Sequence, residues 1–132
     1  SAADAVAALL NQSVELDYQR GRYDIALKNC RDVLVMLGDT ITESSAGSSE
    51  EPINDGLKSS PQLTRARNNL AALYVARGEN DLARKAFQRN LREARQRLSP
   101  GDPALVVQQM NLASVLRLSG RLKPVSYTHL TL

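Results

Sequence analysis

Apolar residues recur at spacings of three and four along two neighbouring stretches, a periodicity typical of amphipathic helices. Over residues 62–77 the apolar stripe consists of Leu63, Ala66, Leu70, Leu73 and Tyr74. Over residues 81–98 it consists of Leu82, Ala83, Ala86, Phe87, Leu91, Ala94 and Leu98. Gly78 lies between the two stretches, and Ser-Pro-Gly-Asp at 99–102 follows the second. The pattern predicts a helix, a tight glycine turn, a second helix and a further turn.

The same features return 42 residues further on. Six residues recur in one register: Pro61, Leu63, Asn69, Leu70, Ala71 and Gly78 reappear as Pro103, Leu105, Asn111, Leu112, Ala113 and Gly120. In both copies a capping residue, Ser60 or Asp102, precedes the proline, which predicts a helix N-terminus. A more divergent copy comes first, at a shift of 57 residues, and it matches Asn11 to Asn68 and Gly21 to Gly78. A fixed period of about 20 to 50 residues is the signature of a solenoid.

These repeats divide the chain. Residues 3–37 form a degenerate first repeat, 61–98 a second, and 103–123 a third that is truncated after its first helix. Residues 38–60 carry five acids and one lysine with little to fill a core, and we expect an acidic, serine-rich loop there. Residues 124–132 resemble the translation of an adapter used in preparing DNA sequencing libraries, and we interpret them as an artefactual tail. We therefore expect a fragment of a longer protein.

Composition favours a helical domain without a membrane span. The chain is 42% hydrophobic and 4% aromatic with no tryptophan, so its core must rest on leucine, alanine and valine. No apolar run approaches the roughly 18 residues that a spanning helix needs, and we expect a soluble, cytoplasmic protein. Cys30 aligns with Phe87 on the predicted buried face. We interpret it as a small core residue instead of a reactive thiol.

The second repeat resembles the tetratricopeptide repeat. The pattern of that family is met by Leu70, Ala71, Tyr74, Gly78, Ala83 and Phe87. The 42-residue spacing, the Asn-Leu-Ala run and the Gly-Asp-Pro connector are similar to the longer variant found in kinesin light chains. The first repeat departs from the pattern, with Asp17 in place of the tyrosine. The resemblance implies an all-α fold, a right-handed superhelical solenoid of antiparallel helix pairs.

In such solenoids the first helices line a concave face, so their polar residues are candidates for binding a peptide. Asn69 and Asn111 share one register, and Gln12 takes that place in the first repeat. Carboxamides can grip the backbone of an extended peptide, although they could equally bridge adjacent helices. With Arg65, one turn before Asn69, and with Asn68, they complete the candidate set. Val107 stands where a second arginine would be needed, so a clamp for a C-terminal carboxylate is weakly supported.

Charge separates the two parts of the chain. Residues 1–60 contain five basic and ten acidic side chains, and residues 61–132 contain twelve and four. Lys85, Arg89 and Arg92 share one face of the second helix of the second repeat and could bind an acidic partner. The alternatives are an ordinary solvated face, or an acidic loop that folds back onto the stripe. Nucleic acid is not expected as a partner, because no aromatic residues interleave with the charges.

No catalytic constellation is present. His129, the sole histidine, lies in the tail, and the chain contains neither a glycine-rich phosphate loop nor a pair of carboxylates fixed on one helix face. We expect no enzyme, no cofactor and no metal site.

The sequence favours a scaffold that binds a peptide or partner protein in the concave groove. One alternative is a regulatory or sensor segment of a larger signalling protein or enzyme. Another is a self-association module, because the truncated third repeat should leave Leu112, Val115 and Leu116 uncovered.

Overall fold

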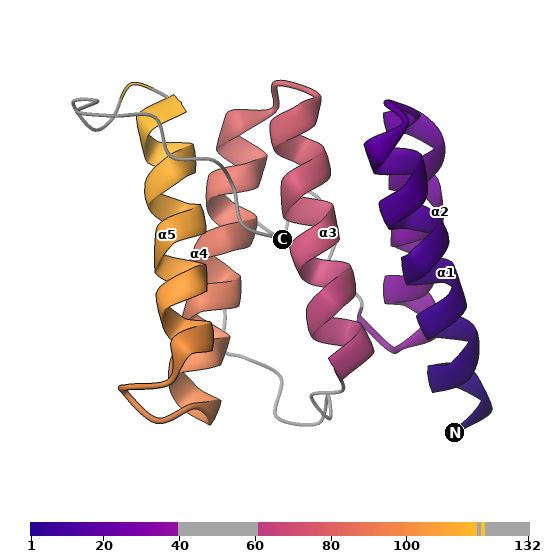
Figure 1. Cartoon of the computed structure of the whole chain (residues 1–132), viewed down its shortest axis with the longest axis horizontal. Coiled ribbons are helices and arrows are strands. Elements are labelled where there is room, and N and C mark those ends of the chain that lie inside the picture. Colours follow the sequence, from indigo (N-terminus) through magenta and orange to yellow (C-terminus); the bar gives the residue numbers. More distant parts are fainter. Residues whose placement is uncertain (40–60, 119, 121–132) are drawn as a thin grey trace.

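The computed structural model describes residues 1–39, 61–118 and 120, and this part of the chain folds into five α-helices (Figure 1). They are α1 (Ala2–Gln19), α2 (Tyr23–Met36), α3 (Pro61–Ala76), α4 (Asn80–Arg97) and α5 (Pro103–Leu118). The described residues contain no strand, so the expected all-α class is confirmed. The two helices predicted from the apolar stripes, over 62–77 and 81–98, each agree with α3 and α4 to within one residue. Within these ranges, no helix has the length and hydropathy that crossing a membrane requires.

The helices lie side by side, with the α1 and α2 pair at one end of the molecule and α5 at the other (Figure 1). α1 packs against α2, and α3 packs against α4. Between the pairs, α3 contacts both α1 and α2, while α5 contacts α4. α3 therefore packs against both helices of the first pair, and α1 and α3 are neighbours.

The helix pairs share one turn geometry. Gly21, between α1 and α2, and Gly78, between α3 and α4, have φ angles of +77° and +76°. In each turn the residue after the glycine donates its N–H to a carbonyl five residues earlier: Arg22 to Asp17 and Glu79 to Tyr74, both at 2.8 Å. Gly120, which follows α5, has a φ of +74°. The predicted glycine turns are confirmed, and the left-handed conformation explains why glycine occupies them.

Replacing Gly78 by alanine is expected to lower the free energy of unfolding by about 1 to 2 kcal/mol, because a Cβ is disfavoured at positive φ. The penalty comes from the backbone, since within the described residues no heavy atom beyond the two chain neighbours lies within 4 Å of the position that the Cβ would take. The matched control is Gly101→Ala, which meets equally open space without a positive φ. Urea unfolding of the two variants compares them directly, and equal midpoints would contradict the backbone explanation.

The main apolar core draws side chains from all five helices. Val14, Leu27, Tyr74, Phe87 and Val115 are its largest fully buried members from α1, α2, α3, α4 and α5 in turn. Cys30 is also in this cluster, and its thiol donates to the carbonyl of Ala66 at 3.2 Å. Burial raises the pKa of the Cys30 thiol to about 12. The interpretation of Cys30 as a core residue is confirmed.

The exposed apolar face of α5 differs from the expected one. Leu112, Val115 and Leu116 were expected to lie uncovered, but Val115 is fully buried and the other two are partly buried. The residues exposed instead are Val106, Met110 and Leu118, at 50%, 43% and 54%. Val106 and Val115 are nine residues apart, about two and a half helical turns, so they lie on opposite sides of α5. Packing of α5 against α4 covers the side that was expected to be open.

The predicted N-terminus of α5 is confirmed by its cap, since the N–H of Ala104 donates to Asp102 Oδ1 at 2.9 Å. The cap predicted at Ser60 lies outside the described residues, as do residues 40–60 of the acidic loop and residues 121–132, which include the whole tail with His129. Asp39, assigned to that loop, is described. It is buried rather than solvated, because it pairs with Arg67 of α3.

Candidate functional site

A groove of about 560 Å³ lies between α1 and α3. Its lining comes from one face of each helix, namely Val14, Glu15, Tyr18 and Gln19 of α1 and Arg65, Asn68, Asn69, Ala72 and Leu73 of α3. The lining residues recur at spacings of three and four because these spacings place side chains on one side of a helix. The groove exists because α3 packs against α1 as well as α2. Its volume lies within the range of about 300 to 1,000 Å³ that is usual for ligand sites.

An ion pair joins the two walls of the groove. Arg65 Nε donates to Glu15 Oε2 at 2.6 Å, and Arg65 Nη2 donates to Glu15 Oε1. Asn69 Nδ2 adds a third hydrogen bond, to Glu15 Oε2 at 3.1 Å. The planar guanidinium and the carboxylate thus meet in the two-point geometry that arginine favours.

The environment of this pair keeps both members charged. Hydrogen bonding from Arg65 is the largest influence on Glu15 and, helped by Asn69, it lowers the pKa of the carboxyl against an opposing effect of desolvation. The hydrogen bond to Glu15 likewise raises the pKa of Arg65. Among the described residues that line the groove, Glu15 and Arg65 are the charged ones, so at neutral pH their charges cancel.

On the α3 side of the lining, three polar atoms have no protein partner within the described part of the chain: Arg65 Nη1, Asn68 Nδ2 and Asn69 Oδ1. The rest of Asn68 is fixed, because its Oδ1 accepts hydrogen bonds from Asn90 Nδ2 at 3.0 Å and Gln108 Nε2 at 3.1 Å. The α3 wall of the groove therefore offers a ligand two donor atoms and one acceptor atom, on side chains that neighbouring helices already hold in place.

Another polar contact crosses between α1 and α3 near the groove. Asn11 is fully buried, and its Nδ2 donates to the backbone carbonyl and the side-chain Oε1 of Gln62 at 3.0 and 3.1 Å. Asn11 precedes Glu15 by one helical turn, and Gln62 precedes Arg65 by three residues. Amide and charged groups thus recur along this interface, and several of the carboxamides in the repeats serve to bridge helices.

The predicted peptide-binding residues separate into two groups. Arg65, Asn68 and Asn69 line the groove, whereas Gln12 and Asn111 do not. Gln12 is exposed on α1. Asn111 is buried, and the position in α3 that corresponds to Glu15 is Ala72, which offers no carboxylate. The three equivalent carboxamides are therefore not brought to one surface.

Sequence reasoning missed Glu15. Its signal was a carboxylate one residue after the buried Val14 and one turn after Asn11, on the α1 face that meets α3. The divergence of the first repeat concealed it, since nothing equivalent occurs in the other two copies.

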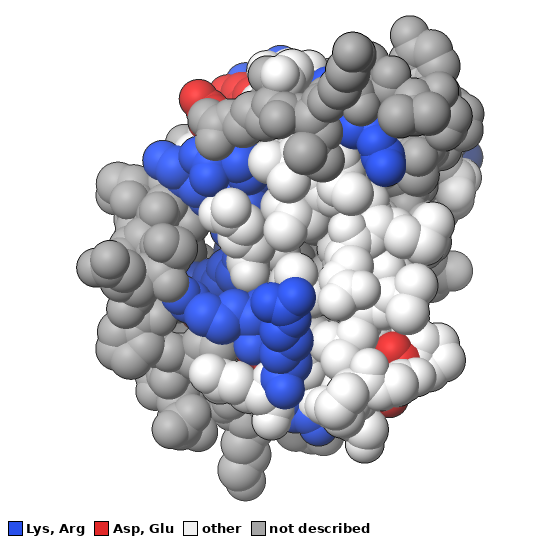
Figure 2. Space-filling model, turned by 90° about the vertical axis from the view of Figure 1, so that its left-hand side faces the viewer, with Lys and Arg blue, Asp and Glu red and all other residues white. Residues whose placement is uncertain are grey.

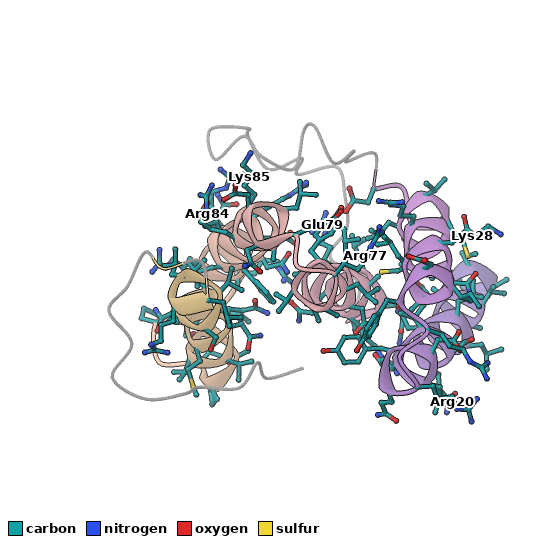
Figure 3. The ribbon with its side chains drawn as sticks, turned by 90° about the horizontal axis from the view of Figure 1, so that it is seen from above. Arg20, Lys28, Arg77, Glu79, Arg84 and Lys85 are labelled. Atoms are coloured by element: carbon teal, nitrogen blue, oxygen red, sulfur yellow. The ribbon has the colours of Figure 1, made fainter. Side chains whose placement is uncertain are left out.

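The basic stripe of Lys85, Arg89 and Arg92 lies on α4, and each of its residues is partly exposed. Figure 3 places Lys85 and its neighbour Arg84 on the outer side of α4, away from α1. Seen from the α5 side, lysine and arginine side chains border a broad uncharged surface (Figure 2). The stripe is thus remote from the groove, and it is a separate candidate surface.

Glu93 lies among the basic residues of α4, and it is buried. Arg67 of α3 donates to Glu93 through Nη1 and to Asp39 through Nε, the latter at 2.8 Å. Arg97 lies on the other side of Glu93, at 3.7 Å. This cluster links the end of the first helix pair to the second pair.

No protein-family model matches the chain, and no curated protein or solved structure is significantly similar to it. Among residues 1–39, 61–118 and 120, no group of three or more histidine, cysteine, aspartate or glutamate side chains is placed to hold a metal ion.

Proposed function

We propose that this chain is a solenoid of tetratricopeptide-like repeats that binds an extended peptide, or an extended segment of a partner protein, in the groove between α1 and α3. The observation that carries the proposal is the groove itself, with Arg65 Nη1, Asn68 Nδ2 and Asn69 Oδ1 left for a ligand. A fold alone does not define a function, whereas these three groups can bind the main chain of a ligand.

Support for the solenoid comes from recurrence at several levels. The 42-residue sequence repeat is accompanied by the same left-handed glycine after α1, α3 and α5. The α3 helix packs on both helices of the preceding pair. Stacking of equivalent units, each resting on the one before, would generate a right-handed superhelix whose first helices share one face.

An extended peptide fits the groove chemically. Each of its residues carries a main-chain acceptor, and each except proline also carries a donor, so Arg65 and Asn68 can bond carbonyls while Asn69 Oδ1 accepts an N–H. The partly exposed ring of Tyr18 adds apolar surface for side chains, while Val14, Ala72 and Leu73 of the lining are almost fully buried. Because the polar groups address the main chain, binding would tolerate several sequences.

A second candidate function is self-association through α5. Val106, Met110 and Leu118 are each at least 43% exposed and give this helix an apolar outer surface. Concentration-dependent sedimentation that disappears in Met110→Glu would support this candidate.

An array of random peptides of about ten residues, long enough in extended form to pass through the groove, tests the proposal. We expect the labelled chain to capture a subset, and Asn69→Ala to weaken those interactions by about threefold to tenfold through loss of one hydrogen-bonding group. Gln12→Ala is the control, because it removes an equivalent carboxamide that lies outside the groove. Capture that is absent, or is unaffected by Asn69→Ala, would contradict peptide binding at this site.

A further inference from the structure

The groove carries an acidic side chain whose position bears on the charge of the ligand. Building on the proposed function, we infer that Glu15 is a specificity-determining residue that excludes acidic ligands. By neutralising Arg65, it makes the groove select peptide segments without a carboxylate, either on a side chain or at a C-terminus.

The ion pair with Glu15 limits how Arg65 can contact a ligand carboxylate. Glu15 occupies two of the nitrogen atoms of Arg65, Nε at 2.6 Å and Nη2, and thereby covers one edge of the guanidinium. A ligand carboxylate could no longer form the two-point contact through that edge, which is the geometry that makes arginine a strong carboxylate receptor. Both N–H groups of Nη1 and the second N–H of Nη2 remain, on the edge of the guanidinium next to the one that Glu15 covers, so the charge of Glu15 decides which ligand oxygen binds there.

The negative charge of Glu15 also repels a ligand carboxylate. A ligand carboxylate bound at Nη1 would lie close to Glu15, within the same partly buried groove, and like charges brought together in this way oppose binding. The exposed fractions of the Arg65 and Glu15 side chains are 37% and 33%, so solvent screens this repulsion incompletely. The other seven lining residues are uncharged and offer a ligand carboxylate no compensating cation.

The hydrogen bond from Asn69 to Glu15 fixes the orientation of the Asn69 amide. Asn69 Nδ2 donates to Glu15 Oε2, which holds the carboxylate against Arg65 and turns the acceptor Oδ1 of Asn69 away from Glu15. An amide oxygen repels a carboxylate and accepts a hydrogen bond from an N–H. The groups left for a ligand are thus those that a neutral main chain would satisfy.

The sequence offers only weak support for a carboxylate clamp at Arg65, and the pairing of Arg65 with Glu15 also argues against one. An unpaired arginine in a first helix would favour acidic ligands, whereas an arginine balanced by Glu15 favours neutral ones. Specificity of this kind comes from a repulsive element as much as from an attractive one.

The test uses pairs of peptides captured in the array, in which a single glutamine is replaced by glutamate, and measures the ratio of their affinities for the chain. The wild-type chain is expected to favour the glutamine member. Glu15→Gln keeps the size of the side chain, removes its charge and frees Arg65, so it is expected to shift the ratio towards the glutamate member by about tenfold or more.

Asp17→Asn is the matched control. Asp17 lies on α1 two residues from Glu15, pairs with Arg22 at 3.9 Å and does not line the groove. It changes the net charge of the chain by the same amount as Glu15→Gln. An equal shift in both variants would overturn the inference, because net charge would then explain the preference.

A second variant changes the other member of the Glu15–Arg65 ion pair, and its result does not depend on whether Glu15→Gln folds. Arg65→Gln leaves Glu15 unbalanced, and it is expected to shift preference from glutamine to a lysine at the same peptide position. Thermal unfolding of every variant establishes that it is folded.

The possible failures are distinguishable. If no chain captures any peptide, the proposed function fails and the inference fails with it. If peptides bind but the ratio for each pair is the same in wild type and Glu15→Gln, the inference about Glu15 is overturned while peptide binding stands.

Discussion

Phe87→Ala is expected to lower the free energy of unfolding by about 3 to 5 kcal/mol, the usual cost of truncating a fully buried aromatic ring. Phe87 has no exposed surface, and it belongs to the cluster to which all five helices contribute. The two small residues beside it in that cluster, Ala83 and Ala86 of α4, cannot expand to fill the space. The resulting cavity would remove packing contacts from both helix pairs.

Urea unfolding followed by circular dichroism measures this effect. Leu9→Ala is the control, because Leu9 is 68% exposed and its truncation removes little buried surface, so the expected change is within about 0.5 kcal/mol. A loss for Phe87→Ala no larger than that of the control would show that the core is not arranged as described.

Arg67→Met is expected to cost about 3 to 5 kcal/mol, the range found when one member of a buried ion pair is removed. Arg67, Asp39 and Glu93 are 8%, 3% and 9% exposed as side chains. Methionine matches the arginine stem but leaves the two carboxylates without their shared cation in a poorly hydrated position. Arg97, at 3.7 Å from Glu93 and more exposed, offsets only part of the loss.

Arg65→Met provides an internal comparison for this second experiment. It makes the same chemical change on the same helix, but at an ion pair that is about one-third exposed, where the expected cost is about 1 kcal/mol or less. Combining Arg67→Met with Asp39→Asn and Glu93→Gln should recover part of the loss, since no buried charge then lacks a partner. Similar stability for the two single variants would mean that burial does not govern the Arg67 cluster.

The sequence predicted the helices well where the apolar stripe was uninterrupted. α3 and α4 carry regular apolar spacing between a glycine and a proline, and these local signals determine where each begins and ends. The glycine turns followed from repetition, because a residue that recurs at equivalent turns is under the same backbone constraint. The family to which these repeats were likened remains a proposal.

The candidate site was predicted only in part. Arg65, Asn68 and Asn69 were found because α3 has the clearest repeat, but Glu15 lies 50 residues before Arg65 in a divergent copy, and periodicity gives no pairing between helices. Burial of Asp39 and Glu93 was missed for a similar reason: each is an acid in a polar stretch, and only the distant Arg67 makes its burial tolerable. The helices could be predicted from local sequence signals, whereas the long-range ion pairs could be identified only from the three-dimensional structure.

The two edges of the helical array differ in how closely their connections are constrained. On the glycine edge, three residues join α1 to α2 and three join α3 to α4, and both turns depend on a left-handed backbone. On the other edge, five residues join α4 to α5, while 24 positions separate Met36 from Pro61. Loops whose length already varies are where a foreign domain is best accommodated. Gly101, with open space around it, is therefore the natural splice point for grafting a reporter without disturbing either helix pair.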